Sequence, residues 1–506
     1  MVSAFRLVEM SFNQGNGFQP RSQRTFLRPV IYNHTLSNLA LTALVVLFVF
    51  CIPMAKVDAQ MTTGFADVKL TSEDRSTEPE VDPTVGFKLI VNKRYLPVDF
   101  DLETLSQVWK VWPKELFEKA AESTSFERQE MAYQRYGFSP REDDGGKPLQ
   151  FVVDQNNNLA MNCFACHGGR LYDSKHSYLG LPNNRINLET LYDDMRAIKR
   201  KLGKPLSGMD IGSALIPMGS TAGTSNAVIF GISLMAFRDR DLNLKSFVIP
   251  PYVVHHDMDA PPWWHYKRKK MLYIDGFTEK HHRALMPFIM VKQNDGEKFR
   301  SYEGDFKSIQ KFIESVEPPK YPYPIDSKLA EFGRVLFETN CASCHGTYGA
   351  KADYPEKIIP IDEIETDKVR FSALSKGYRN NYAKSWLTDY GKAKSFIEPD
   401  GYVAPPLDGI WATAPYFHNG SVPTLAGVLS PSKRPAIWKR TSDKLNKAQM
   451  GITVKSLSEF PKGRSKAERR LIFDTSKYGK SNLGHRFAEE LTDEQHNQII
   501  EYLKTL

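Results

Sequence analysis

The chain has 506 residues, of which 41% are hydrophobic and 25% charged, and its formal net charge is +8. These fractions are typical of globular proteins and exclude a disordered or fibrous chain, while the length allows about two to four domains. Lys and Arg do not cluster along any face, so nothing favours nucleic-acid binding. A polytopic membrane protein is excluded too, because the chain holds a single long apolar run.

That apolar run belongs to a predicted signal peptide over residues 1–59. Arg21, Arg24 and Arg28 precede an apolar stretch at 39–55, and small residues follow as far as Ala59. A basic leader, a short apolar core and a small-residue exit are typical of secretory signals. We therefore expect a periplasmic or secreted protein with no membrane span after cleavage; the alternative is an uncleaved anchor. Cys51 lies in the apolar core and would be removed with it.

Periodicity predicts mainly helices in the rest of the chain. Residues 100–138 carry hydrophobic side chains at spacings of three and four, which indicates helix. Short strands are expected at 89–91 and 151–153. Residues 318–325 are rich in proline and predict a semi-rigid extended linker. Two capped helices should follow, one beginning at Asp326 or Ser327 and one opening with a capping box at Thr492.

The chemistry is carried by two copies of one motif, C-x-x-C-H. Each is the covalent attachment signature of c-type haem. Two thiols three residues apart reach the two vinyl groups on one edge of the macrocycle, and the following histidine provides the proximal imidazole for the iron. The motif predicts two covalently bound haems c. Their attachment residues are Cys163, Cys166 and His167 for the first, and Cys341, Cys344 and His345 for the second.

Other uses of paired cysteines fit less well. A redox C-x-x-C needs neither the following histidine nor a second copy. The two pairs lie much farther apart than the ligands of a zinc ribbon. Structural disulfides are open to an exported protein, but they do not explain a histidine after both pairs in a chain with 12 histidines.

The second haem needs a ligand opposite His345. His485 follows a glycine in a turn of small residues, where the backbone can approach a porphyrin closely. His418 and Met450 are the alternatives, in an aromatic turn and in a loop between charged stretches. His496 is expected on the surface of the last helix. A bis-His haem transfers electrons rather than binding ligands.

The first haem offers too many candidates for its distal side, and an open iron is the other possibility. The candidates on its side of the linker are Met161, Met209, Met218, His255, His256, His281, His282, Met286 and Met290.

The stretch Ala404-Pro405-Pro406-Leu407-Asp408-Gly409-Ile410-Trp411, continuing to Leu425, resembles the bacterial dihaem c-type cytochromes. These are the dihaem rubber oxygenases, the dihaem cytochrome c peroxidases and their tryptophan-modifying relatives. The resemblance runs from about residue 326 to the end and is weaker before that. It implies an open N-terminal haem on His167 that binds dioxygen or peroxide, with Tyr416 approaching it. It also implies His485 as the distal ligand of the C-terminal haem.

Trp263-Trp264 falls where a rubber oxygenase has an electron-relaying tryptophan, which implies a catalytic role for Trp264; the alternative is a purely aromatic core. The chain is shorter than typical rubber oxygenases, and much of their substrate-channel region has no recognisable equivalent, so the resemblance does not specify polyisoprene as the substrate.

The expected fold is therefore mainly α, with two cytochrome c-like haem domains, long loops and a few short strands. The N-terminal haem c domain, with extra helices and loops, would occupy 60–317, and the C-terminal cytochrome c domain 326–506. The expected function is an oxidoreductase, a haem-dependent peroxidase- or oxygenase-like enzyme, whose partner is a redox protein or a small-molecule oxidant. The alternative is a dihaem cytochrome that only transfers electrons.

Overall fold

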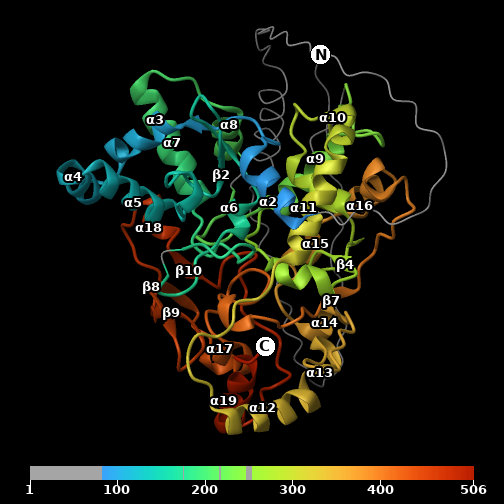
Figure 1. Ribbon diagram of the computed structural model, residues 1–506. Helices are drawn as coiled ribbons and strands as arrows, with labels where there is room; N and C mark the ends of the chain where they lie inside the picture. The colour runs from blue at the N-terminus through green and yellow to red at the C-terminus, as the bar shows by residue number, and fades with distance from the viewer. Residues whose placement is uncertain (1–81, 175, 216–217, 247–253) are drawn as a thin grey trace, which may run out of the picture.

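The structure is a computed structural model that describes residues 82–174, 176–215, 218–246 and 254–506. The predicted signal peptide and Cys51 lie outside these residues. The chain between residues 82 and 315 forms the upper part of Figure 1, and most of the remainder lies below it.

The fold is mixed, with helices and small β-sheets, rather than mainly α as predicted. The described residues contain two three-stranded sheets, β1-β3-β2 and β10-β8-β9, and two two-stranded sheets, β4-β5 and β6-β7. All pairings are antiparallel. The strands are β1 (Phe100–Asp101), β2 (Phe151–Val153), β3 (Asn158–Met161), β4 (Met271–Leu272), β5 (Thr278–Glu279), β6 (Ile358–Pro360), β7 (Gly401–Val403), β8 (Ile437–Asn446), β9 (Gly451–Ser456) and β10 (Ile472–Asp474).

The helices divide at the proline-rich segment. Before it lie α2 (Pro83–Asn92), α3 (Leu102–Gln107), α4 (Lys114–Glu122), α5 (Ser125–Tyr136), α6 (Phe164–His167), α7 (Leu188–Leu202), α8 (Gly208–Leu215), α9 (Ala227–Leu234), α10 (Gly296–Ser301) and α11 (Glu303–Ser315). After it lie α12 (Ser327–Asn340), α13 (Ala342–His345), α14 (Ile361–Ile364), α15 (Val369–Ala373), α16 (Lys376–Ala383), α17 (Leu425–Leu429), α18 (Lys466–Arg469) and α19 (Asp493–Leu503).

The strand predicted at 89–91 is wrong, because these residues lie in α2. The Asp82 side chain accepts a hydrogen bond from the Thr84 N–H, and proline occupies the first helical position, where its fixed φ favours a helix start. Helix α2 packs against α11 at Gly86, where an added Cβ would lie 2.3 Å from the Ser308 carbonyl oxygen. Tertiary packing thus overrides the β-preference of a short apolar run.

The helical segment predicted at 100–138 is present but broken into pieces. It begins with the short strand β1, followed by α3, the 3-10 helix η1 (Val108–Val111), α4 and α5. Pro113 separates η1 from α4, and a capping box between Thr124 and Glu127 opens α5. The strand predicted at 151–153 is confirmed as β2.

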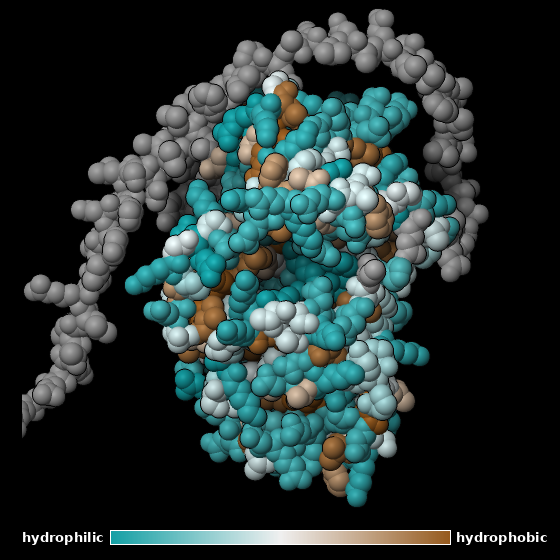
Figure 2. Space-filling model, turned by 90° about the vertical axis from the view of Figure 1, so that its left-hand side faces the viewer, coloured by the Kyte–Doolittle hydropathy of each residue, from teal (hydrophilic) through white to brown (hydrophobic). Residues whose placement is uncertain are grey.

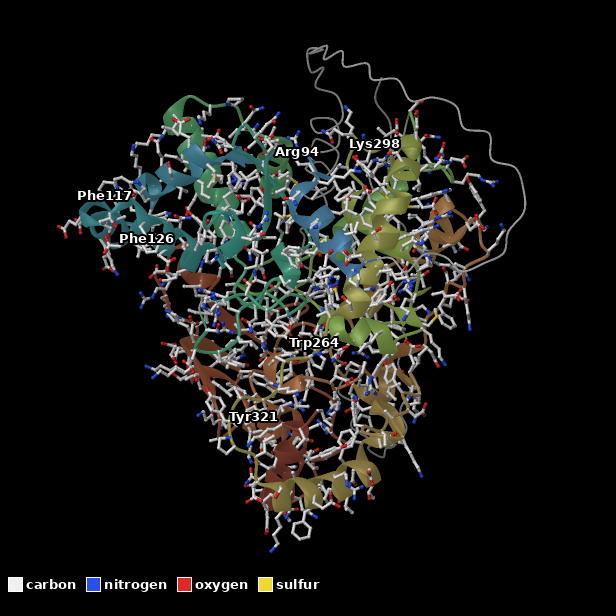
Figure 3. All side chains as sticks on the ribbon, viewed as in Figure 1. Arg94, Phe117, Phe126, Trp264, Lys298 and Tyr321 are labelled. Carbon is white, nitrogen blue, oxygen red and sulfur yellow. The ribbon has the colours of Figure 1, made fainter. Side chains whose placement is uncertain are left out.

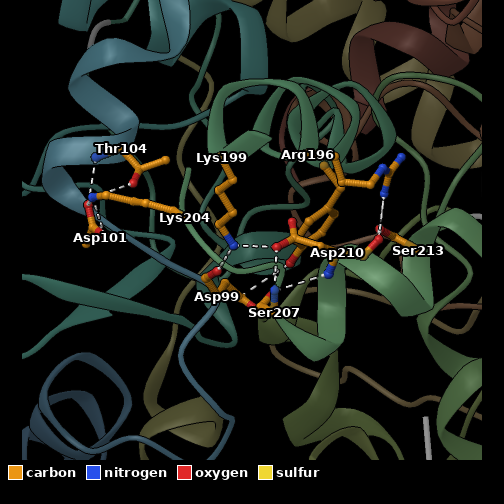
Figure 4. Close-up of polar contacts among 10 residues, drawn as sticks. Asp99, Asp101, Thr104, Arg196, Lys199, Lys204, Ser207, Asp210 and Ser213 are labelled. Atoms are coloured by element: carbon orange, nitrogen blue, oxygen red, sulfur yellow. Dashed lines mark hydrogen bonds and ion pairs between the residues drawn. The ribbon is translucent and has the colours of Figure 1, made fainter. Parts of the chain in front are cut away.

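Buried side chains form two hydrophobic clusters. The smaller belongs to residues 100–218, and a polar network lies beside it (Figure 4): buried Lys199 pairs with buried Asp210 and also donates to the Asp99 carbonyl. The larger cluster runs from Ile90 to Leu503 and includes residues from both sides of the proline-rich segment. The larger cluster therefore spans both predicted domains, while the smaller one lies within the N-terminal part.

The proline-rich segment contains no helix or strand from 318 to 325. It is held against the core, since the Trp411 indole N–H donates to the Pro319 carbonyl at 2.8 Å. Asp326 caps α12 and Thr492 forms the capping box of α19, so both predicted helix starts are confirmed. These two helices pack together at the bottom of Figure 1.

The face shown in Figure 2 is mostly hydrophilic, with scattered hydrophobic side chains, and is hollowed near its centre. Within the described ranges, no helix is both long and apolar enough to cross a membrane.

Candidate haem sites

Helix α6 presents the first C-x-x-C-H motif on a single helical turn. The Cys166 and His167 N–H groups donate to the Cys163 carbonyl at 3.3 and 3.1 Å. This turn brings both thiols and the imidazole to neighbouring positions, as covalent haem attachment requires. Both cysteines are free thiols.

The surroundings of Cys163 fit a macrocycle better than a redox disulfide. Burial raises the pKa of its thiol to about 12, whereas redox-active C-x-x-C thiols have a lowered pKa. The side chain of Cys163 is exposed, so it is accessible to a covalently attached cofactor.

His167 lies beside a tryptophan. Its ring stacks on that of Trp263 at 5.0 Å between centroids, with the planes 29° apart. Its Nδ1 is buried, and burial lowers the pKa of the ring to about 4. The imidazole is therefore neutral at pH 7, the form that binds iron.

Helix α13 repeats the geometry of α6 for the second motif. The Cys344 and His345 N–H groups donate to the Cys341 carbonyl at 3.1 and 3.0 Å. His345 Nδ1 lies 2.8 Å from the Pro405 carbonyl oxygen, which fixes the ring and leaves Nε2 as the ligand nitrogen. Burial lowers the pKa of His345 and raises that of Cys341, the latter to about 11.

The His485 ring faces that of His345. Their centroids are 6.3 Å apart. Two imidazoles that hold one metal ion from opposite sides, with metal–nitrogen bonds of about 2 Å, place their ring centres about 6 Å apart. Burial, and then the proximity of His345, lowers the pKa of His485 to about 4, so both rings are neutral at pH 7. This spacing fits one iron between them.

The loop around His485 also fits a haem. Leu483 and Phe487 are 63% and 48% exposed, although both are large apolar side chains on either side of the histidine. The Phe487 ring meets the His485 ring edge-on at 5.3 Å. A porphyrin between the histidines would cover such side chains.

The rival ligands lie elsewhere. The His418 ring packs on Tyr402 at 4.7 Å, and burial lowers its pKa to about 3. Met450 is in the turn between β8 and β9, with its side chain buried. His496 is not on the surface as predicted: it is 3% exposed, and its Nε2 lies 2.8 Å from the Ala488 carbonyl oxygen. It faces inward because α19 packs this side against the core.

The nine candidates for the first haem are spread over the N-terminal part. In the described part of the chain, no second histidine ring contacts His167, in contrast to the His345–His485 pair. One ring nitrogen of three candidate histidines has a polar partner: Asn226 for His255, the Val254 carbonyl for His256 and Glu303 for His282. Nε2 is buried in both His256 and His281. Met218, Met286 and Met290 are buried among core side chains.

Trp264 is fully buried near the middle of the molecule (Figure 3). Its indole N–H donates to the Asp408 carbonyl at 2.7 Å, and His265 Nε2 lies 3.0 Å from the same oxygen. Gly409 permits this approach, because a Cβ there would lie 3.1 Å from the Trp264 indole nitrogen. His345 is near enough to contribute to the lowering of the His265 pKa to about 3, which is mainly due to burial.

Tyr416 is buried, and its hydroxyl donates to the Ile410 carbonyl at 3.1 Å. The segment around it lies against the first motif: the Asn184 amide donates to the Ala414 carbonyl, and the Asn183 N–H donates to the Cys166 carbonyl.

Two residues beside the candidate sites belong to no sequence pattern that predicts a function. Asp259 is near Cys166, and burial raises the pKa of its carboxyl well above its usual value. Among the described residues, Oδ1 has no hydrogen-bond partner. Arg434 donates to the backbone carbonyls of Gly484 and His485. Neither lies in a motif with a fixed spacing.

Residues 401–439 match the family described as RoxA-like, cytochrome c-like. This match supports a RoxA-like cytochrome c family, and a cytochrome c-like domain implies covalent haem c. The matched segment contributes Pro405 beside His345 and Arg434 beside His485.

Two uncharacterized proteins of Sinorhizobium fredii (strain NBRC 101917 / NGR234) are similar to the chain. Protein y4iM is 25% identical over 305 residues, covering 51% of this chain and 66% of the relative. Protein y4iJ is 27% identical over 257 residues, covering 38% of this chain and 41% of the relative. The chain thus spans less than two thirds of either relative.

Proposed function

We propose that this protein is an exported dihaem c-type cytochrome and an oxidoreductase. Its N-terminal haem, held by Cys163, Cys166 and His167, would react with dioxygen or peroxide, and its C-terminal haem, held by Cys341, Cys344, His345 and His485, would transfer electrons. A redox protein or a small-molecule oxidant would be its partner. The protein would work in the periplasm or outside the cell.

The observation that carries the proposal is the difference between the two motifs. His345 faces a second histidine at 6.3 Å, whereas His167 stacks on Trp263. An iron with two protein ligands is saturated, and an iron with one can bind a small molecule. The described residues thus support one electron-transferring site and one reactive site.

The two sites are also joined by a chain of contacts. Trp263 packs on His167, and its neighbour Trp264 donates to the Asp408 carbonyl. Asp408 lies in the same loop as Pro405, whose carbonyl accepts from His345. This supports Trp264 as the relay between the haems, with Tyr416 packed in the segment next to the first motif.

Spectroscopy of the purified protein tests the proposal. The ferric form should show one high-spin and one low-spin haem, and the reduced form should bind carbon monoxide at one haem per chain. Absence of both the high-spin signal and carbon monoxide binding would refute the reactive site and leave a protein that only transfers electrons.

A further inference from the structure

The loop that carries His485 is held by hydrogen bonds from one side chain, Arg434. This residue follows the 3-10 helix η8 (Pro431–Lys433). Arginine has five N–H donors in a rigid fork, and here they meet five backbone carbonyls. The acceptors and N–O distances are Gly427 at 2.7 Å, Val428 at 3.2 Å, Asn482 at 2.6 Å, Gly484 at 2.8 Å and His485 at 3.3 Å. The guanidinium therefore joins α17 to the 482–485 loop.

The hydrogen bonds of Arg434 hold residues 484 and 485 in a backbone conformation that is usually unfavourable. Gly484 and His485 both have positive φ, +77° and +50°, a conformation that a residue with a Cβ rarely adopts. Gly484 is also pressed against the chain at Ile364, whose carbonyl oxygen would lie 2.3 Å from an added Cβ. Arg434 binds the carbonyls of both residues and so stabilises the conformation that aims the His485 ring.

The charge of Arg434 has no ion-pair partner among the described residues. Its guanidinium lies 5.0 Å from the centre of the Phe417 ring, which in turn lies 6.1 Å from the His485 ring. Burial of this half-buried cation is costly and lowers its pKa to about 10, while nearby Glu489 opposes that shift. Hydrogen bonds from the charged fork to carbonyl oxygens offset the cost of burial. Lysine would keep the charge but has three donors and no fork.

Arg434 also reaches the environment of the imidazole. The Val428 carbonyl that accepts from Arg434 lies near the His485 ring, whose Nδ1 is buried. Groups that surround a ligating histidine without binding the metal orient its ring, and the loss of one typically weakens metal binding about 10–100-fold.

We propose that Arg434 is a positioning residue that holds His485 opposite His345 and so maintains two axial histidines at the C-terminal haem. The inference rests on the proposed function, in which His485 is the second ligand.

The test is a cyanide titration of the full-length, haem-loaded Arg434→Lys variant, followed by optical and EPR spectra. Cyanide must displace His485 to bind the C-terminal haem, so its apparent dissociation constant there should fall about tenfold or more. The ferric high-spin fraction should rise above that of the wild type.

Arg238→Lys is the matched control. Arg238 is buried and also donates only to backbone carbonyls, those of Leu242, Val291 and Asn294. It should lose stability without a change in cyanide affinity. Equal cyanide affinities in wild type and both variants would overturn the positioning role.

The His485→Ala variant distinguishes the positioning role of Arg434 from the proposed role of His485 as a ligand. If His485→Ala removes the low-spin signal and Arg434→Lys leaves cyanide binding unchanged, the positioning role alone falls. If His485→Ala leaves the spectrum unchanged, the ligand assignment fails and the positioning role falls with it. Arg434→Gln serves if the lysine variant does not accumulate. Loss of both Arg434 variants, with Arg238→Lys accumulating normally, would assign Arg434 to folding and also overturn the proposal.

Discussion

Helices α6 and α13 carry the same five-residue pattern with the same backbone hydrogen bonds, yet the space above their histidines differs. Above His345 lies His485, on a loop bound by Arg434. Beside His167 lies the flat face of Trp263. A haem-binding motif thus specifies attachment and one ligand, while residues far away in the chain decide whether an iron is saturated or reactive.

The largest effect is expected from removing one pair of thiols. Cys341→Ser with Cys344→Ser should abolish one covalent haem and destabilise the core around α12 and α19. Mass spectrometry of the denatured protein should show a loss equal to one haem. The double variant Cys163→Ser, Cys166→Ser should lose the other haem. A wild-type protein that carries a single haem would contradict the proposal of two haem sites.

His485→Ala should convert the C-terminal site into a copy of the N-terminal one. We expect the low-spin ferric signal to become high-spin and the reduced protein to bind a second carbon monoxide, because one axial position opens. His496→Ala is the control, since this buried histidine bonds to the Ala488 carbonyl and lies outside both sites. A low-spin haem that survives His485→Ala and disappears in His418→Ala would move the ligand to His418.

Trp264→Phe tests the connection between the sites. It should slow electron transfer between the haems while leaving both haem spectra unchanged, as measured by rapid-mixing spectroscopy after reduction. The variant removes one hydrogen bond to the Asp408 carbonyl, which keeps His265 Nε2 as a neighbour, at a cost of about 0.5–1.5 kcal/mol in the free energy of unfolding.

Trp112→Phe is the matched control for that cost, because Trp112 is also buried and donates its indole N–H to the Tyr136 hydroxyl. Equal transfer rates in wild type and Trp264→Phe would make Trp264 an ordinary core residue.

The effect that is smallest at neutral pH concerns His418, the rival of His485. Burial first, and then nearby His256 and Arg370, lowers its pKa to about 3 from an ordinary value of 6.5. Between these values the unfolded chain binds a proton that the folded chain does not, so stability falls as the pH drops from about 6.5 to about 3. His418→Phe should reduce this slope by up to about 1.4 kcal/mol per pH unit in denaturant unfolding. An unchanged slope would show that His418 is protonated in the folded protein.

Local patterns predicted the elements whose signals are contained in a few neighbouring residues. The caps at Asp326 and Thr492 and the strand at 151–153 are present, because capping and alternation act within one turn or strand. The run at 89–91 was assigned to a strand and lies in a helix, because its partner α11 is more than 200 residues away.

The sequence by itself determined the prediction of covalent haem at α6 and α13, since the attachment signature is contained in five neighbouring residues. Only the tertiary structure decided what lies opposite each histidine. The His485 ring lies opposite that of His345, and Arg434 donates to the His485 carbonyl. His496 faces inward because α19 packs on α12. These contacts join segments far apart in the chain, so no local motif predicts which of several histidines will lie opposite the proximal one.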